Sequence, residues 1–267
     1  NRYLAIDAEK KFLPTIPELL STKGYKSGLV ATSSITHATP AAFYAHIDSR
    51  YKEKEIAKML VDSDIDIALG GGQEFFDVTA SEDSPFMIYD KTLLDSTLLN
   101  PKEQVIGLFA EDGFDRGLGT PTQLEMTQVA LNFLENKSQS CAGFFLMSEG
   151  SQIDWAGHDN DAQYMLVEFA DFDATVQAAT DFAIENQDTL ILVTADHATG
   201  GLVLQRPKGS KVQAQWTTGS HDLSPINIYA YGPGAELFSG VMDNTEIFDL
   251  ILQALDYENL DSANCSS

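Results

Sequence analysis

The stretch "AGFFLMSEGSQIDWAGH", residues 142–158, joins a run of apolar residues to a run of polar ones. A short apolar run that ends in glycine and polar residues is typical of a buried strand. In an open α/β sheet, ligands bind beyond the carboxyl ends of the strands. Glu149, Asp154 and His158 are therefore candidate ligands, and the alternative is a loop that is polar without binding anything.

Helical and strand patterns alternate on both sides of this stretch, which predicts an α/β fold with an open sheet. Before it, we expect helices over 15–24, 36–51, 54–62 and 121–136, and strands over 27–33, 64–72 and 105–110. After it, we expect a helix over 161–186, strands over 189–193 and 227–231, and a terminal helix over 244–255. Residues 77–104 are less regular and are interpreted as a possible insertion in a single domain over residues 1–267.

Two helix starts carry recognisable signals. Thr15 stands three residues before Glu18, which is the spacing of a capping box. Pro40 favours the first position of a helix, which makes Thr39 the expected N-cap. These helices are thus expected to begin directly after Thr15 and Thr39.

Composition and charge limit the classes of function. The 267-residue chain is 43% hydrophobic, which suits a sizeable core, and its 40 acidic and 16 basic side chains give a formal charge of −24. This charge repels nucleic acid and anionic lipid, so we expect no nucleic-acid-binding surface. No segment has the length of a transmembrane helix or the layout of a signal peptide, so no membrane partner is expected. Such acidity suggests a salt-adapted protein, and a phosphate substrate would need cations at the site.

Potential metal ligands follow three of the expected strands. They are Thr39, the group from Glu149 to His158, and Asp196 with His197. Histidine and carboxylate side chains suit zinc, whereas hydroxyl and carboxylate oxygens suit magnesium. Four of the five histidines (His37, His158, His197 and His221) are expected in loops or at strand ends, and His46 on a helix face. The strand order therefore predicts that these side chains converge on one crevice.

Each motif, taken alone, can also be explained by structure without any functional role. The Asp196–His197 pair could be a surface pair, and Arg50 could be a solvated charge at a helix end. Glycines 70–72 lack the lysine and hydroxyl residue of a phosphate-binding loop, which favours a tight turn. Only the joint occurrence of the motifs points to a metal site.

Five segments together make the sequence similar to the alkaline phosphatase family. They are "HATPAAFYAHIDSR", "LGGG", "FLMSEGSQIDWAGH", "VTADHATGG" and "SHDLSPINIYAYGPG", in the order of the family, between residues 37 and 234. The resemblance implies a central, mostly parallel sheet with helices on both faces. It also implies hydrolysis of phosphate monoesters with two zinc ions and one magnesium ion.

The resemblance assigns roles to individual residues. Asp154, His158 and His221 would hold the first zinc ion, which binds the leaving oxygen of the ester. Asp196 and His197 would help to hold the second zinc ion, which stabilises the nucleophile. Two zinc ions in such positions clamp the entering and leaving oxygens of a phosphoryl transfer and supply positive charge to an acidic protein.

The resemblance also assigns the magnesium and phosphate sites. Thr39 and Glu149 match magnesium ligands, and Arg50 matches the arginine that grips the phosphate through its planar fork. His37 and Trp155 match positions beside these sites where some members carry Asp and Lys. A histidine and a tryptophan there suggest looser magnesium binding and faster release of phosphate.

In the family, a serine attacks phosphorus and forms a phosphoserine. The matching serine segment, and an aspartate that bridges two metals, fall before the first residue of this sequence, so we interpret it as an N-terminally incomplete copy of an active enzyme. The alternatives are an inactive remnant that binds zinc or phosphate, and a related phosphodiesterase or sulfatase. The resemblance further suggests a homodimer and a periplasmic or secreted location.

Overall fold

The computed structural model describes residues 2–77, 85–95, 99–100, 103–115, 119–209 and 211–260. The chain divides into two compact units, of which unit 1 runs to Glu149 and unit 2 comprises Gly150–Leu260. The single domain over residues 1–267 stays a prediction. So does the insertion at 77–104, part of which lies outside the described residues.

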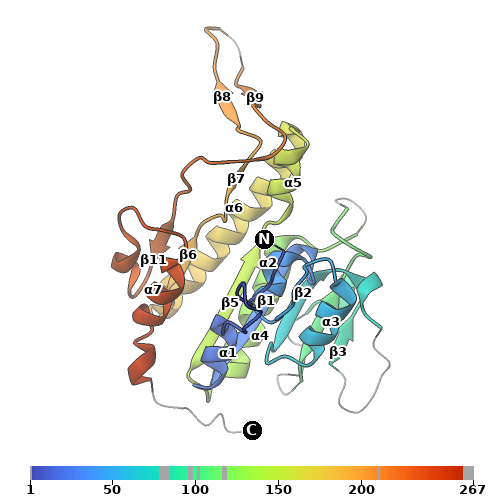
Figure 1. The fold of residues 1–267 in the computed structure, drawn as a ribbon, viewed down its shortest axis with the longest axis vertical. Coiled ribbons are helices and arrows are strands. Elements are labelled where there is room, and N and C mark those ends of the chain that lie inside the picture. The colour runs from blue at the N-terminus through green and yellow to red at the C-terminus, as the bar shows by residue number, and fades with distance from the viewer. Residues whose placement is uncertain are drawn as a thin grey trace. The chain divides into compact units, whose positions relative to one another are not determined.

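Unit 1 is built on a five-stranded parallel sheet in the order β3-β4-β2-β1-β5 (Figure 1). The strands are β1 (Tyr25–Ser34), β2 (Ile67–Gly71), β3 (Phe86–Ile88), β4 (Val105–Leu108) and β5 (Gly143–Glu149). Helix α3 (Glu53–Val61) connects β1 to β2, and helix α4 (Gln123–Ser138) lies between β4 and β5 along the chain. This arrangement confirms the predicted α/β class, because parallel neighbours need crossover connections of this kind.

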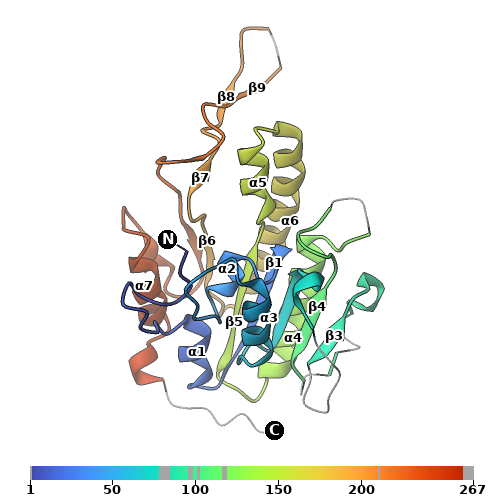
Figure 2. The same ribbon diagram turned by 45° about the vertical axis from the view of Figure 1, so that its right-hand side comes forward.

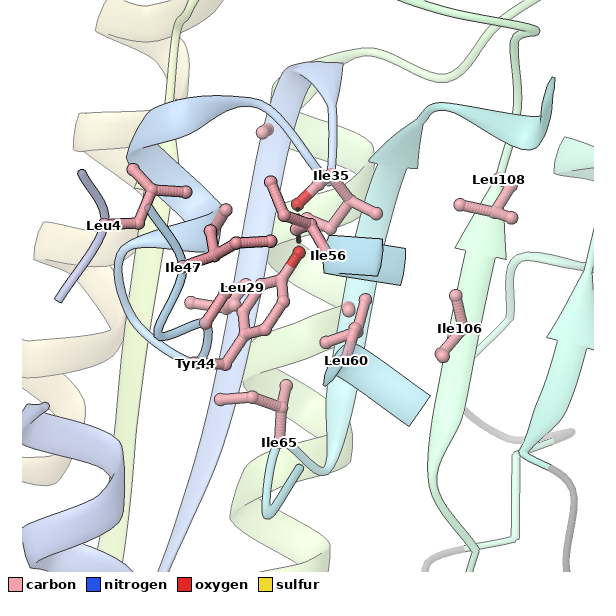
Figure 3. Close-up of a cluster of buried hydrophobic side chains, with 14 residues drawn as sticks. Leu4, Leu29, Ile35, Tyr44, Ile47, Ile56, Leu60, Ile65, Ile106 and Leu108 are labelled. Carbon is pink, nitrogen blue, oxygen red and sulfur yellow. Dashed lines mark hydrogen bonds between the residues drawn. The ribbon is translucent and has the colours of Figure 1, made fainter. Parts of the chain in front are cut away.

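Helices cover both faces of this sheet, and each face has its own apolar cluster. Leu29 of β1 packs with Ile56 and Leu60 of α3 on one face (Figure 3). Val30, the next residue of β1, packs with Met126 of α4 on the other face. Successive side chains of a strand point to opposite faces, so a strand that is buried throughout must be apolar on both. The run "GLVA" in β1 meets that requirement.

The two predicted helix starts have different outcomes. Helix α1 (Ile16–Ser21) begins after Thr15, and Thr15 and Glu18 form the expected capping box. Helix α2 (Ala38–Ala41) is a single turn whose N-cap is His37, so the prediction that Thr39 is the N-cap was wrong. The backbone N–H of Ala41 donates to the carbonyl of His37 at 3.0 Å, which places Thr39 inside the turn.

Unit 2 contains two packed helices, α5 (Gln152–His158) and α6 (Ala162–Asn186), followed by short antiparallel strand pairs and helix α7 (Glu246–Ala254) (Figure 2). Asp161 caps α6, since its carboxylate accepts from the backbone N–H groups of Gln163 and Tyr164. The pairs are β6 (Ile191–Val193) with β11 (Tyr229–Tyr231), β7 (Ala198–Thr199) with β10 (His221–Asp222), and β8 (Val203–Gln205) with β9 (Gln213–Gln215). The pairs β7–β10 and β8–β9 were not expected from the sequence.

Short 3₁₀ turns complete the described elements. They are η1 (Gln73–Phe75), η2 (Lys91–Leu93), η4 (Ala235–Phe238) and η5 (Tyr257–Asn259). A search of the described helices finds none with the length and apolar character needed to cross a membrane.

Candidate metal centre

Helix α5 presents two of the predicted ligands on one side. Asp154 and His158 stand four residues apart, and residues with this spacing share a helix face. Nε2 of His158 lies 3.4 Å from a carboxylate oxygen of Asp154. The expectation of a loop position for His158 was therefore wrong, since it is the last residue of a helix.

Contacts within unit 2 hold α5 in place. The Tyr164 hydroxyl of α6 donates to the Gln152 side chain of α5 at 2.7 Å. On the same helix, Gly157 approaches β7 so closely that a Cβ atom there would lie 3.0 Å from the side chain of Thr199. A larger residue at position 157 would separate the helix from the strand that carries further site residues.

His221 completes a three-ligand cluster with α5. It lies on β10, whose pairing with β7 sets His221 opposite Thr199. Its Nε2 lies 3.2 Å from Nε2 of His158 and 3.7 Å from a carboxylate oxygen of Asp154. Ligand atoms about 2.1 Å from a tetrahedral zinc ion lie about 3.4 Å from one another. The 3.2 Å between the two nitrogens is close to that separation, each nitrogen lies within 3.7 Å of one or the other carboxylate oxygen of Asp154, and one ligand atom from each residue lies within 4.8 Å of the other two.

The tautomer of His158 suits metal binding. Its Nδ1 lies 2.9 Å from the carbonyl oxygen of Gly219, which can only accept a hydrogen bond. Nδ1 therefore carries the proton and donates, and Nε2 is left with its lone pair directed at the cluster. A metal-binding histidine commonly donates its second N–H to a carbonyl in this way.

Asp196 and His197 lie beside this cluster. Nε2 of His197 is 3.2 Å from a carboxylate oxygen of Asp196, and the His197 ring stacks on the His221 ring with centroids 3.6 Å apart. Nδ1 of His197 lies 3.9 Å from the carboxylate of Asp154. Within the described ranges, only Asp154, His158 and His221 form a group of three metal-binding side chains.

Thr199 is a site residue that the sequence interpretation missed. Its hydroxyl donates a short hydrogen bond to Asp154 and lies 3.3 Å from Nδ1 of His197. The bond to Asp154 orients the carboxylate, and such supporting contacts tune the affinity of a metal site. The only signal in the sequence was its position two residues after His197 in "DHATGG".

Unit 1 carries the predicted magnesium and phosphate residues. Thr39 lies in α2, which contacts both β1 and β5. Glu149 is the last residue of β5 and pairs with Ala31 of β1. Both half-buried side chains thus belong to elements at the carboxyl ends of neighbouring strands, where an open α/β sheet binds its ligands.

Arg50 is held by His37. Its guanidinium Nη2 lies 2.9 Å from Nε2 of His37, and its backbone N–H donates to the carbonyl of Arg2 at 2.8 Å. Because a guanidinium can only donate, Nε2 of His37 is the acceptor. Arg50 is half-buried, so the interpretation as a freely solvated charge does not hold.

Trp155 and His46 have different surroundings. Trp155 is a half-buried residue of α5, next to Asp154. The prediction that His46 lies on a helix face was wrong, because α2 ends at Ala41. Instead, the His46 ring stacks on Phe12, and its Nε2 lies 2.7 Å from the Glu18 carboxylate. His46 therefore fixes the first residues of the chain to α1.

The glycine triplet spans the end of strand β2 and the start of a turn, since Gly70 and Gly71 close β2 and Gly72 caps η1. Gly72 has a φ of +100°, and a Cβ atom on Gly71 would lie 1.7 Å from the carbonyl oxygen of Asp112. The tight-turn interpretation is confirmed for Gly72 alone, and glycine at positions 71 and 72 avoids a shift of the backbone.

Comparison with known proteins places this site in a family. Residues 1–88 and 80–215 match the family model described as alkaline phosphatase. Alkaline phosphatase 3 of Bacillus subtilis is 33% identical over 345 aligned positions, which cover 96% of this chain and 74% of that protein. Streptomycin-6-phosphate phosphatase of Streptomyces griseus is 30% identical, with coverage of 91% and 71%.

Two solved structures of alkaline phosphatases have the same fold as this chain. The alkaline phosphatase of the Antarctic bacterium TAB5 superposes with a TM-score of 0.85 at 35% identity, covering 96% of this chain and 80% of that chain. The cold-active alkaline phosphatase of Shewanella sp. superposes with a TM-score of 0.84 at 28% identity, covering 96% and 81%. The α/β fold, the cluster of Asp154, His158 and His221, and the similarity to alkaline phosphatases together identify the chain as a metal-binding hydrolase of phosphate monoesters. The chain belongs to the alkaline phosphatase family.

Proposed function

We propose that this phosphatase works with two zinc ions and one magnesium ion, and that Asp154, His158 and His221 hold the first zinc ion. The observation that carries the proposal is that one ligand atom from each of the three side chains lies within 4.8 Å of the other two, with the two Nε2 atoms 3.2 Å apart. Two nitrogens and one carboxylate oxygen leave a fourth tetrahedral position open, which is the pattern of catalytic zinc sites. Zinc bound there supplies positive charge that stabilises the leaving oxygen.

The other predicted site residues are proposed to bind the second zinc ion, the magnesium ion and the phosphate. Asp196 and His197 are proposed as ligands of the second zinc ion, and Thr39 and Glu149 as ligands of magnesium. Arg50 would hold two oxygens of the phosphate, since its guanidinium presents parallel N–H donors. The family resemblance supports a serine nucleophile and a phosphoserine, and none of the serines in the printed sequence is assigned that role.

The proposal is tested by measuring zinc content and turnover together. Asp154→Ala and His158→Ala should each remove one equivalent of zinc and lower kcat/KM for an aryl phosphate by at least about 100-fold. Asp159→Asn is a matched control, because Asp159 is an exposed carboxylate at the end of the same helix. Full zinc content in both alanine variants would overturn the ligand assignment. Comparing rates on an aryl monoester, a diester and a sulfate ester separates the monoesterase from a diesterase or sulfatase.

We also propose that His37 weakens magnesium binding at the third site, and that Trp155, which places no cation beside the phosphate, speeds phosphate release. In the TAB5 enzyme, mutants with glutamate or aspartate in place of a histidine have magnesium bound in the M3 site. A carboxylate is a harder ligand than imidazole and suits magnesium better. His37→Asp should therefore retain magnesium during dialysis that strips it from the wild type. Equal retention by the two proteins would contradict this role.

We infer from the family resemblance that the protein forms a homodimer and acts in the periplasm or after secretion. The formal charge of −24 supports the further proposal of adaptation to salt, because ions screen the mutual repulsion of its carboxylates. Stability that stays the same between low and molar NaCl would contradict the salt proposal.

A further inference from the structure

His46 lies in unit 1 between two hydrogen-bond acceptors. Its Nδ1 lies 2.8 Å from the carbonyl oxygen of Ala5, and its Nε2 lies 2.7 Å from the Glu18 carboxylate. A carbonyl and an ionised carboxylate can only accept hydrogen bonds, so both ring nitrogens must carry protons. The geometry therefore selects the doubly protonated, cationic form of His46, because the loss of either proton breaks one of the two bonds.

The Glu18 carboxylate is ionised where it meets the ring. Its Oε2 accepts from the backbone N–H and the hydroxyl of Thr15 at 2.8 and 3.1 Å, and its Oε1 accepts from His46. Burial opposes the ionisation of Glu18, but the hydrogen bonds from His46 and Thr15 hold the pKa of this carboxyl below its ordinary value. An ionised Glu18 in turn favours the cationic form of His46.

Few other charges lie close to the ring. Among the charged side chains that the structure describes, Glu18 is the one within ion-pair distance of His46. Asp48, two residues after His46, pairs with Lys10 at 3.1 Å. The Asp7 carboxylate accepts from backbone N–H groups of its own turn at 2.8 and 2.9 Å. The charge of His46 is therefore coupled most directly to Glu18.

The Ala5 carbonyl belongs to a segment that pairs with the residues after His46. The backbone N–H of Leu4 donates to the carbonyl of Ile47 at 3.0 Å, and the N–H of Ile47 donates back at 3.1 Å. This is an antiparallel pairing, and both side chains are buried in the same apolar cluster (Figure 3). We call the paired residues 2–5 and 47–50 the ladder.

Arg50 is bound to the end of the ladder. Its backbone N–H donates to the carbonyl of Arg2 at 2.8 Å. In the same strand of the ladder, Ala5 has a φ of +40°, a left-handed conformation that alanine adopts only at an energetic cost. Such a conformation persists where its surroundings hold it, and the Ala5 carbonyl is held by the bonds from His46 and from the Leu13 N–H. His46 thus holds the segment to which the backbone of Arg50 is bound.

We propose that His46 in its doubly protonated form is a positioning residue, which holds Arg50 in place through the ladder. The inference rests on the proposed role of Arg50 in binding phosphate. When His46 gives up a proton to water as pH rises, one of its two bonds is lost, the ladder loosens and Arg50 holds phosphate less firmly. A residue outside the metal centre therefore couples the release of phosphate to alkaline pH.

The first test compares inhibition by inorganic phosphate in the metal-loaded wild type and His46→Gln across pH. Titration of phosphate and of the metal centre affects both proteins alike, so it cancels in the ratio of the two inhibition constants. At low pH, His46→Gln should bind phosphate at least about threefold more weakly, because its amide cannot replace both charged bonds. Above the pH at which His46 loses its proton, the ratio should approach one. The KM for an aryl phosphate should follow the same pattern without a fall in kcat, since binding and not chemistry is weakened.

The second test follows the ring and the ladder directly in the wild type. NMR of the isotope-labelled imidazole gives the pH at which His46 loses its proton, and hydrogen exchange gives the protection of the Leu4 and Arg50 amides. The midpoints of the imidazole titration, of the loss of amide protection and of the change in inhibition should coincide. In His46→Gln, both amides should be weakly protected at every pH.

Lys10→Gln is the matched control, because it removes a cation that pairs with Asp48 instead of His46. It should keep the pH dependence of the wild type, with inhibition constants within about twofold. Glu18→Gln removes the charge that His46 faces and should move the transition to lower pH. Together with the NMR titration of the wild type, this variant decides the matter even where His46→Gln does not fold.

The outcomes separate this inference from the proposed role of Arg50. A ratio of inhibition constants that does not change with pH, or amides of Leu4 and Arg50 that stay protected after His46 has lost its proton, would overturn the inference alone. Arg50→Lys with the inhibition constants of the wild type at every pH would overturn the phosphate role of Arg50 and the inference with it.

Discussion

His158 and His221 bring their Nε2 atoms to within 3.2 Å of each other although 63 residues separate them in the chain. The bond from Nδ1 of His158 to the Gly219 carbonyl leaves the lone pair of His158 Nε2 in the gap between the rings. Two such lone pairs repel unless a proton or a cation lies between them. The close approach of these two nitrogens therefore needs either a shared proton or a bound cation.

Removal of metal should lower the thermal stability. A ligand that binds only the folded state stabilises it by mass action, so chelation should lower Tm and added zinc should restore it. Asp154→Ala should lose most of this response, whereas Asp159→Asn should keep it. Differential scanning fluorimetry with and without a chelator measures the effect, and equal shifts in both variants would place the bound zinc elsewhere.

Thr199 should affect zinc affinity without being a ligand. Thr199→Val keeps the shape of the side chain and removes the hydroxyl that donates to Asp154. We expect zinc affinity to fall about 10- to 100-fold, the usual effect of losing a partner of a metal ligand. Thr199→Ser retains the hydroxyl and should stay near wild type in a zinc titration against a competing chelator. Equal affinities of the valine and serine variants would argue against the role.

Arg50 and His37 should act together on phosphate binding. Arg50→Lys should lower kcat/KM about 10- to 100-fold, because one bond between charged groups contributes about 1.5–3 kcal/mol. His37→Ala removes the acceptor that holds Arg50 and should weaken inhibition by inorganic phosphate. In the Arg50→Lys background, His37→Ala should have a smaller effect. Additive effects in this double-mutant cycle would show that the two residues act independently.

Protonation of Glu18 at low pH should lower the thermal stability of the folded protein. Burial opposes ionisation of this carboxyl, but the hydrogen bonds from His46 and Thr15 outweigh it and lower the pKa of Glu18. A lowered folded pKa means that the stabilisation from ionised Glu18 is present above the unfolded pKa, about 4.3 for a glutamate, and is lost as pH falls from there through the folded value. Glu18→Gln should flatten the dependence of Tm on pH in this range. Parallel Tm profiles for the two proteins would contradict this.

The packing of α3 can be tested by removing one side chain. Leu60 is fully buried, and Leu60→Ala should lower the free energy of unfolding by about 2–5 kcal/mol. Lys58→Ala, on the exposed side of the same helix, should change it by about 0.5 kcal/mol or less. Urea unfolding measures both values. A loss below about 1 kcal/mol for Leu60→Ala would mean that the cluster around it is loosely packed.

The sequence alone predicted α1 and β1 of unit 1 and the kind of chemistry of the candidate site, but not β3 or the shortness of α2. Strand β1 is apolar on both faces and Thr15 with Glu18 forms a capping box, so interactions among near neighbours in the chain specify these elements. The residue types in "EGSQIDWAGH" and "DHATGG" likewise point to metals, because carboxylate and imidazole groups are the side chains that zinc binds besides thiolates. These features depend on residues within a few positions of one another.

Only the tertiary structure decided how the ligands meet. Helix α5 sets Asp154 and His158 on one face, and the pairing of β7 with β10 brings His221 to them and Thr199 to Asp154. It also placed His46 against Glu18, 28 residues away, instead of on the expected helix face. Strand pairs of two residues carry almost no periodic signal, and their partners are chosen by packing over long separations in the chain. The pattern of the sequence therefore specified which side chains are candidate ligands, while long-range packing set their distances.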